Sequence, residues 1–188
     1  FGGVGLAAAT SQHAAFLKNV LSAPIKVVTG FAGTNEVNLA MQRGEVDASC
    51  GMFLSSAKGP YGKDIASGSL KLIIQLGREN EPFFGDAVNI YTLLKTPDEK
   101  AMADFVFRQV EIARPIAAPP GLPEPIAEAL RRGFDAVVRD PELLADMHKA
   151  QLDVQPMSSA ETAKAFADFA QTPRQLVERA KAAMIAGP

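Results

Sequence analysis

The sequence predicts an α/β fold in which a mostly parallel sheet is flanked by helices. Strand-like and helix-like segments alternate through the first half of the chain, as they do in β–α–β–α–β units. Residues 70–76 (LKLIIQL) form an almost continuous apolar run, which is typical of a strand that is buried on both faces. Beyond residue 88 the patterns are mainly helical.

The first expected helix covers residues 10–22. Thr10 or Ser11 stands at its start and is expected to be the N-cap, because a hydroxyl can accept from the first free amides. The apolar residues of this segment recur at helical spacing and fall on one face. They are Phe16, Leu17, Val20 and Leu21.

A strand, a loop and a second helix follow. The β-branched run at 25–28 predicts a short strand, and residues 30–35 form a glycine-containing loop after it. Residues 36–43 predict a helix that ends at Gly44, because glycine is favoured just past a helix C-terminus. Residues 46–50 then predict the next strand.

The second half begins with a helix that starts around Pro97. Proline is favoured in the first turn, where its missing amide costs nothing. Residues 114–123 contain four prolines, which predict a stiff, extended connector. We therefore expect a lobe boundary here, with one lobe at 1–113 and a crossover and helical segment at 114–188.

Three helical stretches are expected after the connector, at about 124–138, 141–151 and 159–186. Pro173 is expected to break the last of them. A short strand-like segment covers residues 152–154.

Composition excludes several classes of function. The 188 residues carry a formal net charge of −2 with scattered basic residues, which argues against nucleic acid or an anionic membrane as partner. No stretch has the length of a membrane span. Cys50 is the only cysteine, so an internal disulfide is excluded and a small buried apolar role is favoured over a cleft-lining one. Phe1 resembles the end of a strand, and we expect that the chain's beginning is missing.

Residues 3–8 (GVGLAA) fit the glycine pattern of a dinucleotide-binding loop that leads into a helix. That function also requires an acidic residue at the end of the second strand, to bind ribose hydroxyls. Here the second strand ends in Val28-Thr29-Gly30, without an acidic residue or an arginine. The sequence therefore disfavours a nicotinamide or flavin cofactor.

A more general anion site remains compatible with the pattern. Glycines before a helix allow close backbone approach, and free amides at a helix start favour an anion. Residues 30–35 form a second loop of this kind, and both loops would leave the same edge of a parallel sheet. Together, backbone amides and the hydroxyls of Thr10, Ser11 and Thr34 could hold a carboxylate. Simple turns with helix N-caps are the alternative that the pattern leaves open.

No catalytic or metal centre is predicted. His13 and His148 lie on helices without metal-ligand spacing, and each is expected to be a surface or packing residue. Ser11 is not in a nucleophile elbow. Glu36 lies in a first helical turn, where its charge stabilises the helix. We therefore expect a protein that is not an enzyme and that holds no cofactor.

Several segments occur in an order that resembles the substrate-binding receptors of tripartite tricarboxylate transporters, the Bug family. The most specific are GTNEVNLAMQRGEVD and RPIAAPPGLP. The others are GGVGLAAATSQHAAF, LKLIIQLGRE, DAVNIYTLLKTPDEKAMADFVF and LDVQPMSSAETAKAF, so the resemblance covers almost the whole chain.

The resemblance implies a type II periplasmic-binding-protein fold, a two-lobed Venus flytrap. It implies a periplasmic receptor that captures a small organic carboxylate and presents it to membrane transporter subunits. This chain would contain most of the second lobe and the C-terminal part of an incomplete first lobe. The helices beyond residue 123 would then expose apolar area, and we expect dimerisation or swapping if the chain is truly truncated.

The resemblance also implies ligand-binding residues in the two loops. Ala7–Ala9 depart from the hydroxyl-rich family pattern, which argues against a highly polar ligand. The implied residues are Gly3, Val4, Gly5, Ala7, Ala8, Ala9, Thr10 and Ser11 in the first loop, and Phe31, Gly33, Thr34 and Asn35 in the second.

Two rival functions remain at this point. One is an enzyme domain that binds NAD(P) or a phosphate, for which nucleotide binding would be diagnostic. The other is a protein-interaction module that binds no small molecule, for which side chains would fill the space between the loops.

Overall fold

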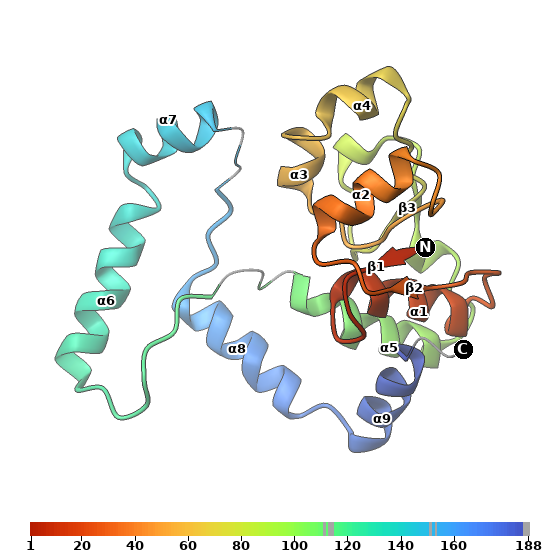
Figure 1. The fold of residues 1–188 in the computed structure, drawn as a ribbon. Coiled ribbons are helices and arrows are strands. Elements are labelled where there is room, and N and C mark those ends of the chain that lie inside the picture. Colours follow the sequence, from red (N-terminus) through yellow and green to blue (C-terminus); the bar gives the residue numbers. More distant parts are fainter. Residues whose placement is uncertain (111, 113–114, 151, 153, 186–188) are drawn as a thin grey trace. The chain divides into compact units, whose positions relative to one another are not determined.

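The computed structural model describes residues 1–110, 112, 115–150, 152 and 154–185 (Figure 1). The chain divides into two compact units. The first unit contains residues 1–53, 72–107 and 173–188, and the second contains 54–71 and 108–172. The boundary expected between residues 113 and 114 falls outside the described residues, so it stays a prediction.

The first unit contains two pairs of parallel strands. Strand β1 (Gly2–Gly3) pairs with β2 (Val28–Thr29), and β3 (Ile74–Gln75) pairs with β4 (Val88–Asn89). The expected strand at 46–50 is reduced to a parallel bridge between Gly2 and Ser49. The chain is therefore a mixed α/β protein with short parallel strand pairs.

The expectation that residues 70–76 form a strand buried on both faces is wrong. Only Ile74–Gln75 are extended and paired, and the Ile73 side chain is 57% exposed. The buried position is instead taken by Gln75, whose Nε2 donates to Ala87 O (3.0 Å) and whose Oε1 accepts from Glu81 N (2.9 Å). The hydrogen-bonded side-chain amide of Gln75 therefore takes a buried position at which the apolar run predicted a hydrophobic residue.

Four longer helices of the first unit confirm the predicted helices, with the exact bounds shifted by a few residues. Helix α9 lies against α5, and Asn19 of α1 anchors its end by donating from Nδ2 to Ala183 O (2.9 Å) and Ile185 O (3.0 Å). Pro173 separates α9 from the helix before it, as predicted. The four helices are α1 (Ala9–Val20), α2 (Thr34–Gln42), α5 (Pro97–Phe107) and α9 (Arg174–Ala183); short 3₁₀ turns lie at Pro82–Phe84 and Ile90–Thr92.

The core of the first unit forms around α1 and α5. Phe16 of α1 meets Phe107 of α5 edge to face, with 5.1 Å between ring centroids. Ile90 and Val106 are fully enclosed in the same cluster. Cys50 also belongs to it, and burial raises the pKa of its thiol to about 12, which confirms the predicted role of a small buried residue.

His13 is a packing residue, as predicted. It is 4% exposed and lies edge to face with Phe107 at 5.2 Å, and neither ring nitrogen has a hydrogen-bond partner among the described residues. Burial lowers the pKa of His13 from 6.5 to about 4, because the charged imidazolium cannot be solvated there. The ring is therefore neutral in the folded protein at neutral pH.

This burial makes folding stability sensitive to acid. Between pH 6.5 and 4 the unfolded chain binds a proton at His13 that the folded chain does not. The contribution is fully present above pH 6.5 and is lost on acidification towards pH 4, by about 3 kcal/mol in all. We expect His13→Leu to flatten the profile of unfolding free energy against pH over this range, as measured by urea denaturation.

The control for this prediction is His148→Asn, which removes the chain's other histidine from an exposed helix. This variant should keep the acid-dependent loss. Identical acid profiles for His13→Leu and the unmodified protein would contradict the assignment.

The second unit contains helices with little buried surface. None of α6, α7 and α8 contains a buried residue, and Ile126, Leu130 and Val137 of α6 are each at least half exposed. Arg108 ties α8 to the start of this unit through an ion pair with Asp168 (2.9 Å). The helices are α3 (Leu54–Lys58), α4 (Gly62–Ser67), α6 (Glu124–Val137), α7 (Pro141–Lys149) and α8 (Ser159–Ala170).

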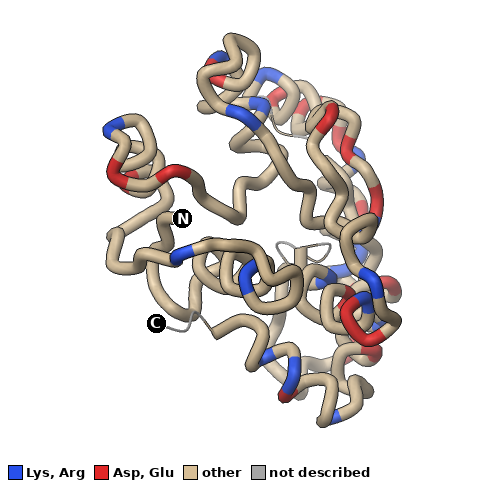
Figure 2. Tube along the Cα trace, turned by 90° about the vertical axis from the view of Figure 1, so that its right-hand side faces the viewer, with Lys and Arg blue, Asp and Glu red and all other residues tan. Residues whose placement is uncertain are grey.

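Exposed apolar area beyond residue 123 is therefore present, as expected, while dimerisation stays a prediction. The expected strand at 152–154 falls partly outside the described residues. Figure 2 shows Lys and Arg interspersed with Asp and Glu along the chain. None of the described helices combines the length and apolar character that a bilayer span requires.

Candidate functional site

The first unit brings the two glycine-containing loops to one edge of a strand pair. Gly3 lies opposite Thr29 in the parallel register of β1 and β2. Directly after the strands, Gly30 N donates to Val4 O (3.3 Å), so the two loops start side by side. This is the arrangement that the alternation of strands and helices predicts.

Helix α1 begins one residue earlier than predicted. Its N-cap is Ala8, in an extended conformation (φ −83°, ψ 146°), and no side chain caps the helix. The expectation that Thr10 or Ser11 is the N-cap is wrong, because both hydroxyls face back onto the first loop. Thr10 Oγ1 accepts from Val4 N (3.1 Å), which holds that loop against the helix.

Ser11 lies against Gly3. The position that a Cβ on Gly3 would occupy is only 2.1 Å from Ser11 Oγ, so no other residue fits at position 3 without a shift of Ser11. The Ser11 side chain is 1% exposed, and its hydroxyl has no hydrogen-bond partner among the described residues. The buried Ser11 hydroxyl thus packs against Gly3, and the described part of the chain offers it no acceptor.

Two amides at the start of α1 have no backbone acceptor among the described residues. The first helical hydrogen bonds run from Ser11 N and Gln12 N to Ala8 O, and in the described part of the chain no backbone carbonyl accepts from Ala9 N or Thr10 N. The first turn also lacks an acidic residue. Among the described residues, neither a side-chain cap nor a first-turn carboxylate offsets the partial positive charge of this helix end.

Helix α2 begins differently. Glu36, in its first turn, turns back so that its Oε2 accepts from Gly33 N (3.1 Å). The Glu36 carboxylate thus lies at the start of α2, in agreement with the structural role predicted for this residue. Thr34 and Asn35 are exposed beside it. The starts of α1 and α2, which both follow a glycine-containing loop, therefore differ: α2 has the Glu36 carboxylate in its first turn, and α1 has no acidic residue there.

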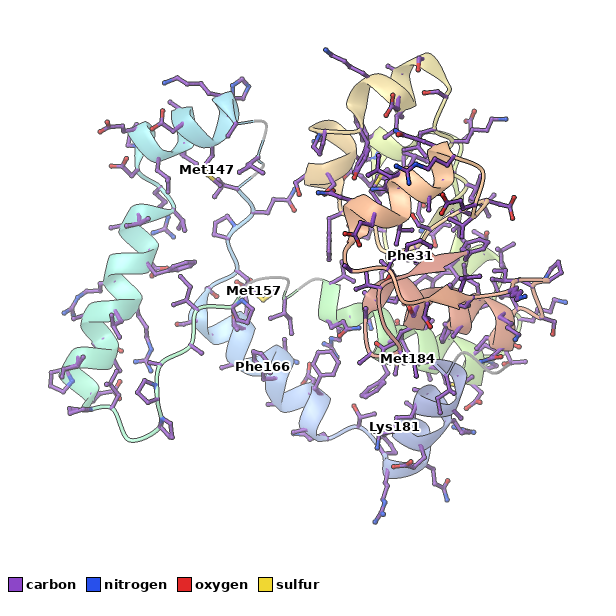
Figure 3. All side chains as sticks on the ribbon, in the orientation of Figure 1. Phe31, Met147, Met157, Phe166, Lys181 and Met184 are labelled. Carbon is purple, nitrogen blue, oxygen red and sulfur yellow. The ribbon has the colours of Figure 1, made fainter. Side chains whose placement is uncertain are left out.

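Phe31 of the second loop packs against β1. Its Cε2 is 3.4 Å from the position of a Cβ on Gly2, and Val37 and Val46 approach the same point. Figure 3 shows Phe31 lying over the strands of this unit. The ring therefore packs against β1 at Gly2, and this packing explains its placement in the loop.

A third segment, which the sequence analysis did not assign to the site, also reaches the start of α1. The position of a Cβ on Gly51 is 3.5 Å from Thr10 N and 3.7 Å from Ala9 Cβ, and Gly51 adopts φ +82°, which favours glycine. The sequence signal that could have assigned Gly51 to the site is its position directly after the expected strand at 46–50. Nearby in sequence, Phe53 is 47% exposed.

The segments that contain the two loops, and the segment around Gly51, have no positively charged side chain. Residues 1–17, 27–42 and 46–57 contain no Lys or Arg. The exposed side chains are instead apolar at Leu6 (69% exposed) and Ala7. Any anion held here would depend on backbone dipoles rather than on an ion pair.

No metal-binding cluster of His, Cys, Asp or Glu occurs among the described residues. A shallow hollow of about 470 Å³ lies in the first unit where α1, α5 and α9 meet, with Asn19, Asp98 and Arg179 on its walls. None of the predicted ligand residues lines it. The Asp98–Arg179 ion pair and the anchoring of α9 by Asn19 explain these polar groups.

Comparison with known proteins identifies no relative: no family profile, curated protein or solved structure matches this chain.

Proposed function

We propose that this chain is a solute-binding protein that captures a small organic carboxylate at the N-terminus of α1. The observation that carries the proposal is that, within the described part of the chain, α1 has no side-chain cap, no acidic residue in its first turn and no backbone acceptor for the Ala9 and Thr10 amides. An anion there would accept from both amides and would interact favourably with the helix dipole.

The contrast with other helices of the chain supports this proposal. At the start of α7, Asp140 Oδ1 accepts from Leu143 N (2.9 Å). Ser158 Oγ accepts from Glu161 N at the start of α8, and Glu36 Oε2 accepts from Gly33 N at the start of α2. Like α9, whose first turn also lacks a side-chain cap and an acidic residue, helix α1 differs from these three helices, which supply their own acceptor. Its start also lies where two loops leave parallel strands, which is the usual place for a ligand in α/β proteins.

The resemblance to the Bug receptors supports the wider proposal. On that basis the protein is a periplasmic receptor of type II periplasmic-binding-protein fold that delivers its ligand to tripartite tricarboxylate transporter subunits. Catalysis is not part of the proposal, because the site offers hydrogen-bond donors but no pair of acid and base groups.

The test is a thermal-shift and calorimetric screen of the full chain against mono-, di- and tricarboxylates. We expect at least one carboxylate to raise the melting temperature, since a ligand at 100 times its Kd stabilises the folded state by about 2.7 kcal/mol. Sodium chloride at matched ionic strength is the control for nonspecific salt effects.

The same screen includes NADH, ATP and inorganic phosphate. Micromolar nucleotide binding would replace the proposal with the rival enzyme function. Lack of stabilisation by every carboxylate would contradict the proposal and would favour a protein-interaction module.

A further inference from the structure

We propose that α6 (Glu124–Val137) is a dimerisation face, on which α6 of a second copy of this chain packs in the antiparallel direction. This inference goes beyond the proposed function and does not depend on it, because α6 belongs to the second unit and contains none of the proposed ligand residues.

The apolar stripe of α6 is the first argument. Its large apolar residues follow one another at steps of four, four and three residues, so they lie on one side of the helix. Three of them are at least half exposed, and none is buried within the described part of the chain. Such a stripe is removed from water only when another apolar surface covers it. The four residues are Ile126, Leu130, Phe134 and Val137.

Gly133 provides the second argument. Glycine inside a helix lowers the stability of the helix, and Gly133 has no positive φ that would require it. Apart from its chain neighbours and the backbone of its own helix, no atom of the described chain lies within 4 Å of the position of a Cβ at Gly133. The contacts of this chain therefore do not explain the glycine, whereas the close approach of a second helix would explain it.

The order of large and small residues fits an antiparallel copy. When two antiparallel α6 helices are centred on residues 131–132, Leu130 of each copy lies opposite Gly133 of the other. The same register places Phe134 opposite Ala129. Large side chains of one helix then face small residues of the other, as close helix packing requires. One patch serves both copies, as it does in a two-fold interface.

The charges of α6 favour the same arrangement. Residues 124–130 contain Glu124 and Glu128 and no basic residue, so they carry a net charge of −2. Residues 131–139 contain three arginines and Asp135, so they carry a net charge of +2. Antiparallel copies place the negative half of each helix beside the positive half of the other, whereas parallel copies place like charges together. Because the whole segment is neutral, an anionic membrane or a strongly charged protein is not favoured as the occupant.

Sedimentation velocity of the full chain at constant ionic strength tests the inference. A helix of 14 residues is about 21 Å long, which is short for the roughly 800 Å² that each partner buries in a stable dimer. Arg131 also pairs already with Glu124 and Glu128 of its own helix. We therefore expect a dimer of moderate affinity, with a Kd on the order of 10 μM, and both species between about 1 and 300 μM chain.

Two variants of α6 make the test specific to this face. Leu130→Gln removes apolar surface from the stripe and should raise the Kd about tenfold. Gly133→Leu adds apolar surface and favours the helix, but its side chain would take the place of Leu130 of the other copy, so it should also raise the Kd about tenfold. Leu6→Gln removes a leucine that is 69% exposed in the first unit, and this matched control should leave the Kd unchanged. Circular dichroism of each variant verifies that the helices are retained.

The outcomes decide between a second copy and other occupants of the stripe. A chain that stays monomeric up to about 300 μM would overturn the inference and would leave the stripe to a partner of another kind. A dimer whose Kd neither α6 variant changes would place the interface elsewhere. Tighter association of Gly133→Leu would show that apolar surface alone drives association, which would contradict the antiparallel register.

Discussion

Ala8→Asp is expected to stabilise the folded protein by about 1 kcal/mol and to abolish carboxylate binding. Ala8 already has the extended backbone conformation of an N-cap residue, and aspartate is among the best N-cap residues. Its carboxylate would accept from the amides at the start of α1 and would occupy the proposed anion position. Urea denaturation measures the first effect, and calorimetry with the tightest carboxylate from the screen measures the second.

The opposite signs of these two effects make the prediction informative. A variant that merely damages the fold would lose both stability and binding. Ala7→Asp is the matched control, because it adds the same charge one residue earlier on an exposed part of the loop. This control should retain most of the binding. Wild-type affinity in Ala8→Asp would exclude the start of α1 as the ligand site.

Gly3→Ala is expected to destabilise the protein by about 1–3 kcal/mol. The new methyl group would overlap Ser11 Oγ and would lie 3.1 Å from Ser11 Cβ and 3.3 Å from Ser11 Cα, so rotating the hydroxyl alone would not relieve the crowding. Ser11→Ala removes the oxygen, so the double variant should recover much of the loss. Urea denaturation of the four proteins in this cycle gives the coupling between the two positions.

Two single variants complete this test. Ser11→Ala alone should be neutral or slightly stabilising, because it removes a buried hydroxyl without a hydrogen-bond partner. Gly5→Ala should have little effect, since no atom lies within 4 Å of a Cβ at that position. Equal stability of Gly3→Ala and the unmodified protein would show that β1 and α1 do not approach as closely as described.

The helices were predictable because their signals are local. Pro97, Pro141 and Pro173 mark helix starts, and Gly44 follows the end of α2, so the periodic apolar pattern only had to fill the spans between them. The strands were less predictable. Each paired strand has two residues, and the burial of Gln75 depends on Ala87 and Glu81, which no pattern within residues 70–76 reveals.

At the candidate site, too, contacts between residues close in sequence were predictable and contacts that depend on the path of the chain were not. The capping role of Glu36 depends on a residue three positions away and can be read from sequence. Thr10 Oγ1 accepts from Val4 N, and Ser11 packs against Gly3, across a turn whose path the sequence does not define. Both hydroxyls therefore looked like helix caps, whereas the Thr10 hydroxyl holds the first loop against α1 and the Ser11 hydroxyl is buried beside Gly3. The packing of α9 onto α5 and the bond from Asn19 to Ala183 are longer-range still.

Amide chemical shifts during a carboxylate titration test the central claim most directly. With the ¹⁵N-labelled full chain and the tightest carboxylate from the screen, we expect the amide proton resonances of Ala9 and Thr10 to move downfield in a saturable manner, as hydrogen bonds to an anion form. Those of Thr34 and Asn35, at the start of α2, should move little. Saturable binding that leaves Ala9 and Thr10 unshifted, or that shifts α2 instead, would contradict the assignment of the carboxylate to the start of α1.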